Sequence, residues 1–184
     1  LGDACRGISL HVANSAAVLN HPRVCRQFDC VRIGLLPFGV YPDRRLAGRL
    51  PLAPVLSGFC RVLFVKDVEA GERLSYGLTF RAPRRMRVAT LGVGYADGLR
   101  RALSNRYAVV AGGRPAPIIG NICMDQTLID VTGAAVRAGD KVTIFDRRFD
   151  VETMAQVAGT VPQEILCGFG WSRMEKEYAG GNRA

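Results

Sequence analysis

Two short segments near the start of the sequence carry groups that can bind an anion. Ser15 lies where an apolar segment gives way to a helical one, so free amides of a helix start follow its hydroxyl group. Gly34 and Leu35 end a second apolar segment and offer backbone N–H donors. On neighbouring strands these donors converge, and a phosphate monoester suits them. A helix cap at Asn14 or Ser15 and a strand end at Gly34 explain the same residues without a ligand.

Two tyrosines in glycine-containing segments are candidates for proton transfer. Tyr76 lies in the sequence S-Y-G and Tyr95 in G-Y-A-D-G. A phenol is a weak base at neutral pH, so a catalytic tyrosine needs surroundings that stabilise phenolate, and nearby arginine charge would do so. A sheet tyrosine with a satisfied hydroxyl group and an ordinary turn are the alternative, purely structural explanations.

The first 45 or so residues predict a parallel strand–helix–strand unit. Residues 8–12 form an apolar strand, residues 16–20 a helix that Pro22 stops, and residues 29–34 a second strand ending in glycine. A strand, a helix and a strand within so short a stretch are typical of a parallel sheet or barrel.

The rest of the chain predicts an antiparallel β structure. Beyond a linker bracketed by Pro51 and Pro54, apolar runs recur at short intervals with glycine-rich turns between them, which indicates a sandwich or a small barrel. A late helix over residues 151–158 is capped by Asp150 and closed by Gly159. The predicted strands are residues 59–66, 73–80, 86–93, 107–111, 127–131 and 141–145.

Composition and charge narrow the function classes. A hydrophobic content of 48% excludes a disordered chain, and no apolar run approaches the roughly 18 residues that span a bilayer. The net charge of +9 comes from 22 arginines and only three lysines. Residues 81–114 hold eight arginines against the single acid Asp97, but these alternate with apolar residues and lack interleaved aromatics. Nucleic-acid binding is therefore not expected, and small anionic ligands, especially phosphates, fit the same surplus of positive charge as well.

The cysteines favour a reduced protein. The six cysteines include no C-x-x-C pair and the chain has only two histidines, so a zinc site is not expected. Several cysteines lie within apolar, strand-like runs, which indicates buried thiols and a cytoplasmic location.

Five ordered motifs together resemble the second half of an alanine racemase. They are H-x-A-N-S-A from His11, R-x-G from Arg32, G-E-x-x-S-Y-G from Gly71, G-Y-A-D-G from Gly94 and I-C-M-D-Q from Ile122. The resemblance implies a pyridoxal-phosphate isomerase that supplies D-alanine for peptidoglycan and works as a head-to-tail homodimer. The implied fold is mainly β: residues 1–48 are a remnant, the last strands and helix, of a (β/α)8 barrel, and residues 49–184 are an antiparallel, barrel-like β domain.

The resemblance assigns the cofactor site to the N-terminal residues. Ser15 and the backbone of Gly34 and Leu35 would hold the cofactor phosphate, and Arg32 would face the pyridine nitrogen. Because a guanidinium stays protonated, it donates no proton to the ring, which leaves the ring a poorer electron sink and favours racemisation over other reactions. His11 would form a hydrogen bond toward Arg32.

The resemblance assigns the substrate side to the β domain. Tyr76 would exchange the Cα proton on the face opposite the cofactor lysine, and Tyr95 would line the entrance. The backbone of Met124, with its neighbours Cys123 and Asp125, would approach the substrate carboxylate. In this family these residues serve the cofactor of the other subunit.

The sequence departs from the family pattern in three ways. In this family the lysine that binds the cofactor lies upstream, in the barrel half that this chain lacks. None of the three lysines of this chain stands at a matching position, so we expect this chain alone to be inactive. Gln163 stands where tyrosine is usual, near the phosphate, and raises serine as a substrate beside alanine, as in serine racemases of glycopeptide resistance. Asn121 replaces an arginine and loosens the entrance electrostatics.

Two further hypotheses stay open at this stage. One is a non-catalytic, basic module that binds nucleic acid, and the other is a degenerate paralogue without activity. The presence of both Tyr76 and Arg32 argues against the degenerate paralogue.

Overall fold

The N-terminal unit forms as the sequence predicts. The computed structural model describes residues 7–147, 150–170 and 174–179. Strand β1 (His11–Asn14) pairs in parallel with β2 (Cys30–Arg32), and α1 (Ser15–Asn20) connects them. Asn14 is the residue that caps α1, because its side chain accepts the N–H of Ala17. Pro22 does more than stop α1: it begins a second short helix, α2 (Pro22–Cys25), as proline suits a first helical position.

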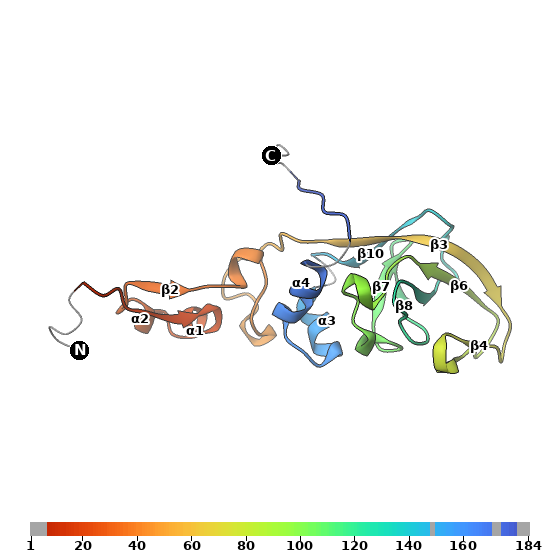
Figure 1. Ribbon diagram of the computed structural model, residues 1–184, viewed down its shortest axis with the longest axis horizontal. Helices are drawn as coiled ribbons and strands as arrows, with labels where there is room; N and C mark the ends of the chain where they lie inside the picture. The colour runs from red at the N-terminus through yellow and green to blue at the C-terminus, as the bar shows by residue number, and fades with distance from the viewer. Residues whose placement is uncertain (1–6, 148–149, 171–173, 180–184) are drawn as a thin grey trace.

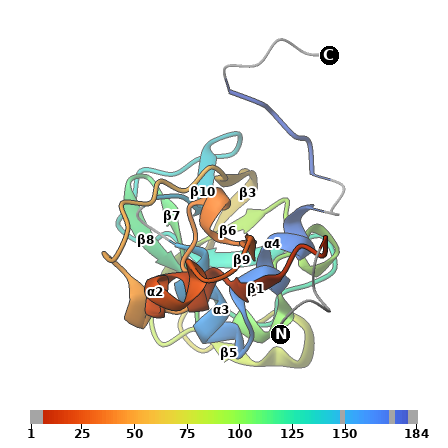
Figure 2. The ribbon, with the colours of Figure 1, turned by 90° about the vertical axis from the view of Figure 1, so that its left-hand side faces the viewer.

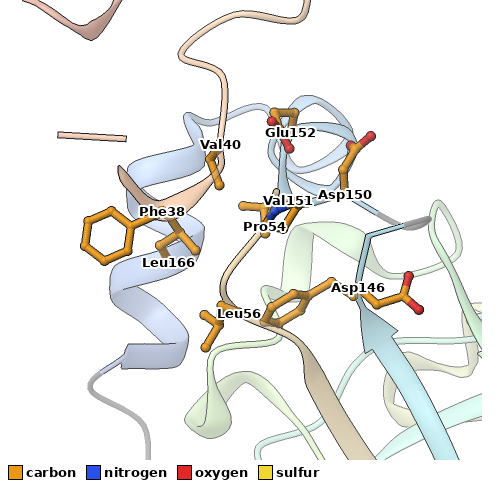
Figure 3. A pocket seen from close by; sticks show the side chains of 10 residues that line it. Phe38, Val40, Pro54, Leu56, Asp146, Asp150, Val151, Glu152 and Leu166 are labelled. Atoms are coloured by element: carbon orange, nitrogen blue, oxygen red, sulfur yellow. The ribbon is translucent and has the colours of Figure 1, made fainter. Parts of the chain in front are cut away.

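A connecting segment fixes the N-terminal unit to the rest of the molecule. It holds two 3₁₀ helices, η2 (Leu36–Phe38) and η3 (Arg44–Leu46), and docks on α3 (Val151–Ala158) and α4 (Pro162–Gly170). The N–H of Tyr41 donates to Glu152 at 2.9 Å and Arg44 donates to Thr153 at 2.8 Å. A cavity with room for about one water molecule lies beneath this contact, lined by residues that include Phe38, Val40, Pro54, Val151 and Leu166 (Figure 3).

The β domain is a nearly closed, antiparallel barrel-like sheet. Its strand order is β8-β7-β10-β3-β6-β9, and a bridge between Ile118 and Ile129 links the two ends of the sheet. This confirms the predicted small barrel. A separate two-stranded sheet pairs β4 with β5. The strands are β3 (Gly58–Val68), β4 (Arg73–Leu74), β5 (Phe80–Arg81), β6 (Met86–Leu91), β7 (Ala108–Ala111), β8 (Arg114–Pro117), β9 (Thr127–Asp130) and β10 (Lys141–Phe145).

One large core holds the sheet and the two late helices together. Fully buried side chains such as Leu91, Ile129 and Ile144 come from the sheet, while Met154 and Ile165 come from α3 and α4. Burying a side chain of this size stabilises the fold by about 1.5–3 kcal/mol. Along the long axis of the molecule the β1–β2 unit lies at one end, α3 and α4 in the middle and the sheet beyond (Figure 1). Figure 2 looks along this axis, with α2 and β1 in front.

The structure corrects three expectations about elements. The predicted strand over residues 73–80 is two short strands separated by the 3₁₀ turn η4 (Tyr76–Leu78). Strand β8 was not predicted, because Pro115 and Pro117 argue against a strand. Both prolines are tolerated since they alternate along an edge strand, so their missing N–H groups share the side away from β7. Helix α4 was missed because its glycines lower helix propensity.

Candidate active site

The β1–β2 unit brings the predicted phosphate donors together. Ser15 is 5% exposed, and its Oγ accepts the N–H of Gly34 at 3.0 Å and of Leu35 at 3.3 Å. The hydroxyl group can still donate its own proton. A Cβ built on Gly34 would meet no atom within 4 Å, so open space lies beside these donors. Both amides donate to the Ser15 oxygen here, so a phosphate group at this position would accept the hydroxyl proton and share the two amide N–H groups with Ser15.

Arg32 and His11 lie beside these donors on the same pair of strands. The Arg32 Nη1 is 2.7 Å from His11 Nδ1 and donates to the His11 carbonyl oxygen at 3.1 Å. Since a guanidinium only donates, Nδ1 is the acceptor and the ring proton lies on Nε2. The predicted contact between His11 and Arg32 is therefore present. We call Ser15, Gly34, Leu35, Arg32 and His11 the anion cluster.

Tyr76 lies on an exposed and strained turn of the β domain. Its side chain is 77% exposed, and the turn contains three positive φ angles, 64° at Ser75, 71° at Gly77 and 51° at Leu78. With ψ at 170°, Ser75 adopts a conformation that is nearly restricted to glycine and costs on the order of 1–3 kcal/mol. Contacts with other parts of the chain must hold this turn in place. Because such contacts leave no local pattern in the sequence, residues 73–80 were predicted as a strand.

The Tyr95 segment and the I-C-M-D-Q segment are joined along their backbones. The N–H of Tyr95 donates to the Cys123 carbonyl at 3.0 Å, and the N–H of Ala96 donates to the Met124 carbonyl at 2.9 Å. A Cβ on Gly94 would lie 2.3 Å from the Cys123 oxygen, so only glycine permits this approach. The structure thus brings Tyr95, Cys123 and Met124 together, the residues that the family resemblance assigns to the substrate side.

This pairing fixes the direction of two amide groups. In a trans peptide the C=O and the N–H point in opposite directions. Because the carbonyls of Cys123 and Met124 point at the Tyr95 segment, the N–H groups of Met124 and Asp125 point away from it. Both amides lie on one side of an exposed loop, where they can donate hydrogen bonds to a carboxylate. We call Tyr76, Tyr95, Cys123, Met124 and Asp125 the tyrosine cluster.

The buried carboxylate of Asp97 holds the Tyr95 segment of this cluster in place. The sequence predicted only a turn at this position. The carboxylate accepts the N–H of Gly94 at 2.9 Å, and the segment packs on α4, where a Cβ on Gly98 would be 2.8 Å from Phe169 N. Burial and the charge of Asp97 raise the pKa of the Cys60 thiol to about 12. Cys60 is therefore unsuited to be a nucleophile.

Gln163 is an exposed residue in the first turn of α4, between the buried residues Pro162 and Ile165. The next residue, Glu164, forms an ion pair with Arg100 at 2.6 Å, which ties α4 to the segment that follows Gly98. The assignment of Gln163 to the phosphate remains a prediction.

The two clusters lie on different parts of the molecule. The anion cluster is on β1, β2 and the residues that follow them, at one end of the long axis, whereas Tyr76 follows Ser75 after β4, which lies at the other end (Figure 1). Tyr95 follows β6, whose last residue pairs with Val62 near the start of β3, and its segment packs on α4 in the middle of the molecule. The described chain therefore does not bring all of its candidate site residues into one site. Each cluster presents half of the predicted chemistry.

The comparisons with known proteins agree with the motifs and with the fold. Residues 55–178 match the family described as alanine racemase, C-terminal domain. The chain is 40% identical over 173 residues to the alanine racemase of Halothermothrix orenii, covering 91% of this chain and 45% of that protein. It is also 40% identical to that of Nostoc, covering 88% and 42%. The chain thus spans less than half the length of these curated relatives.

Solved structures extend the likeness beyond the family domain. The alanine racemase of Streptomyces lavendulae superposes with a TM-score of 0.87 at 34% identity, over 95% of this chain and 46% of that one. That of Bartonella henselae, which carries covalently bound pyridoxal phosphate, gives 0.80 at 31% identity over 88% and 44%. Motifs, barrel-like sheet and family match agree: the chain belongs to the alanine racemase family and carries its C-terminal domain.

Proposed function

We propose that this chain is part of a pyridoxal-phosphate-dependent racemase that interconverts L- and D-alanine by two-base proton exchange. The observation that carries the proposal is the anion cluster, in which Ser15 Oγ accepts two backbone N–H bonds beside the Arg32–His11 pair. This donor set suits a phosphate and an aromatic ring nitrogen held side by side. The likeness to a relative with bound pyridoxal phosphate supports the same cofactor.

In this proposal each residue of the anion cluster binds or orients. Ser15 and the amides of Gly34 and Leu35 hold the phosphate. Arg32, oriented by His11, faces the ring nitrogen and gives it no proton, because a guanidinium remains charged at any working pH. When bound, pyridoxal phosphate supplies an electron-withdrawing ring that stabilises negative charge at the substrate Cα.

The tyrosine cluster positions the substrate and moves its proton. The Met124 and Asp125 amides bind the substrate carboxylate, and Tyr95, 45% exposed, lines the entrance. The Tyr76 side chain removes the Cα proton on one face as phenolate, which makes it a phenol, or returns that proton as a phenol, while a lysine acts on the opposite face.

We propose that this lysine is supplied from outside these 184 residues. Lys141 stacks on the Phe59 ring at 3.6 Å and Lys66 lies on β3, both in the β domain and far from the anion cluster along the chain. The relatives are about twice as long as this chain, which leaves room for the remaining barrel. Without that half we expect the chain to be inactive.

A second copy of the protein would complete the site. Because one chain does not bring the two clusters into one site, a head-to-tail homodimer would place the tyrosine cluster of one subunit against the anion cluster of the other. Apolar side chains exposed on the β domain, including Leu63, Phe64 and Leu78, are available to such a contact.

The structure offers no comparable support for nucleic-acid binding. Several arginines of residues 81–114 pair with acids of the same domain, so part of the basic charge has a local partner. Arg84 pairs with Asp130, and Arg85 with Asp67 and Glu69. In addition, no helix in the described ranges is long and apolar enough to cross a membrane.

The proposal is tested on the complete enzyme, meaning the product of the whole reading frame that carries these residues. We expect pyridoxal phosphate to be required for racemisation of both alanine enantiomers, with D-alanine production measured chirally. Tyr76→Phe, which keeps the ring and removes the hydroxyl group, should reduce racemisation by about a hundredfold or more. Equal rates for Tyr76→Phe and the parent would overturn the role of Tyr76.

Serine is the second candidate substrate, because Gln163 presents a polar amide on an exposed turn. The same assay with L-serine, in the parent and in Gln163→Tyr, decides between the two. A serine preference that Gln163→Tyr abolishes would favour serine, and alanine rates that dominate in both proteins would exclude it.

A further inference from the structure

The Tyr76 turn is attached to a single residue by bonds on both sides of the tyrosine. The Asn121 side-chain Nδ2 donates to the Tyr76 carbonyl at 2.7 Å, and the Ser75 Oγ donates to the Asn121 carbonyl at 2.6 Å. Since the Tyr76 partner is a carbonyl oxygen, the Asn121 amide nitrogen must face it. These two bonds bracket the peptide that carries the tyrosine.

Asn121 is itself held firmly. The N–H of Gly120 donates to Asn105 Oδ1 at 2.6 Å, and the N–H of Ile122 donates to Ser104 Oγ at 2.9 Å. The backbone on both sides of Asn121 is therefore fixed to one neighbouring segment. A Cβ on Gly120 would lie 2.4 Å from the Ser75 Cβ, so the backbone at Gly120 lies as close to Ser75 as glycine allows.

The same residue directly precedes the loop whose amides face outward. Asn121 is followed by residues 122–126, which carry the Met124 and Asp125 N–H groups. The tyrosine and the loop thus share one attachment point, although Tyr76 is 45 residues away in the chain. A strained and exposed turn would otherwise sample several conformations.

We propose that Asn121 is a positioning residue, which holds the Tyr76 hydroxyl group in register with the carboxylate-binding loop. This inference rests on the proposed function. It differs from the sequence-based expectation, in which Asn121 changes the electrostatics of the entrance and the strictness of alanine specificity. Asn121 acts through the backbone of Tyr76 and contacts no reacting atom itself.

The test uses two variants of the complete enzyme and one matched control. Asn121→Ala removes the amide, and Asn121→Asp keeps its shape but replaces the donor by a carboxylate oxygen that faces a carbonyl. Thr132→Val is the control, because the Thr132 side chain likewise forms a hydrogen bond with backbone 45 residues away: its Oγ1 accepts the Arg87 N–H at 2.9 Å. This bond lies at the end of the β6–β9 pair that is away from Tyr95 and Cys123. All three lose one exposed side-chain bond to the backbone.

We expect both Asn121 variants to lower kcat by about 10- to 100-fold, the size that a misplaced catalytic group produces, with little change in KM. In D₂O, deuterium uptake at Cα on the lysine face should persist while racemisation falls. The ratio of uptake to racemisation therefore rises in the Asn121 variants and stays at the parental value in Thr132→Val.

A second measurement does not depend on activity. Hydrogen–deuterium exchange of the peptide over residues 73–80, without cofactor, should quicken in both Asn121 variants and remain parental in Thr132→Val. Parental kinetics and parental exchange in the Asn121 variants would overturn the inference while leaving the proposed function intact. Absence of racemisation in the parent enzyme would overturn both.

Discussion

Arg32 and His11 share a short hydrogen bond across the parallel β1–β2 pair, with Nη1 2.7 Å from Nδ1. The strand register places His11 opposite Cys30, two residues before Arg32, so the imidazole meets the guanidinium diagonally. The histidine accepts and the arginine donates, and the orientation of the guanidinium follows from that bond.

Removing the imidazole should therefore act through Arg32. We expect His11→Phe to lower kcat of the complete enzyme by about tenfold, the value of one charge-assisted bond. His11→Asn, whose side-chain oxygen can still accept from Arg32, should recover part of the loss. His21→Phe, on the N-terminal side of α2, is the control and should behave as the parent. Parental rates for His11→Phe would show that Arg32 needs no such support.

Ser15→Ala should weaken cofactor binding. The variant removes the hydroxyl group on which the Gly34 and Leu35 amides converge. Loss of one bond to a charged ligand corresponds to an increase of about 10- to 100-fold in the dissociation constant. Titration of the cofactor-free enzyme with pyridoxal phosphate measures it, and Ser57→Ala, on the exposed connecting segment, is the control. Equal affinities in the two variants would exclude Ser15 from the phosphate site.

Gly94→Ala should separate two loops that are joined in the structure. The new Cβ would lie 2.3 Å from the Cys123 oxygen and 2.4 Å from the Met124 oxygen, so the backbones must move apart. We expect a loss of about 1–3 kcal/mol in the free energy of unfolding, measured with urea. At Gly170 a Cβ meets nothing within 4 Å, so Gly170→Ala should unfold as the parent does. A neutral Gly94→Ala would contradict the described contact.

Stability should decline at alkaline pH because of Cys60. Burial and Asp97 raise the pKa of its thiol from 9.0 to about 12, so the unfolded chain loses this proton first. The contribution is fully present below pH 9 and is lost as the pH rises toward 12. Cys60→Ala should show a shallower decline in urea unfolding across this window. Cys167→Ala, which removes an exposed thiol, should keep the parental slope, and an unchanged slope in Cys60→Ala would refute the assignment.

Tyr107 should contribute in the same direction. Burial and the charges of Asp150 and Asp146 raise the pKa of its phenol from 10.0 to about 12. Part of the alkaline decline therefore remains in Cys60→Ala.

The sequence predicted best those parts of the fold that local connectivity determines. Ser15 and Gly34 converge because a strand, a helix and a strand follow one another directly in the sequence. The residues that begin and end helix α3, Asp150 and Gly159, are likewise its immediate neighbours in the sequence. Tyr76 was named from a motif, but its turn was predicted as a strand. The strain at Ser75 is balanced by contacts with Gly120 and Asn121, more than 40 residues away, and no local pattern records such contacts.

The distance between the two clusters has a genetic consequence. If Ser15 and Tyr76 belong to half-sites that meet only between copies, a Ser15→Ala subunit and a Tyr76→Phe subunit are each impaired alone, at cofactor concentrations too low to saturate Ser15→Ala, but not together. In a heterodimer of the two variants, one active site carries both substitutions and the other carries neither. Two defective alleles expressed in one cell would then complement each other and remove its requirement for external D-alanine.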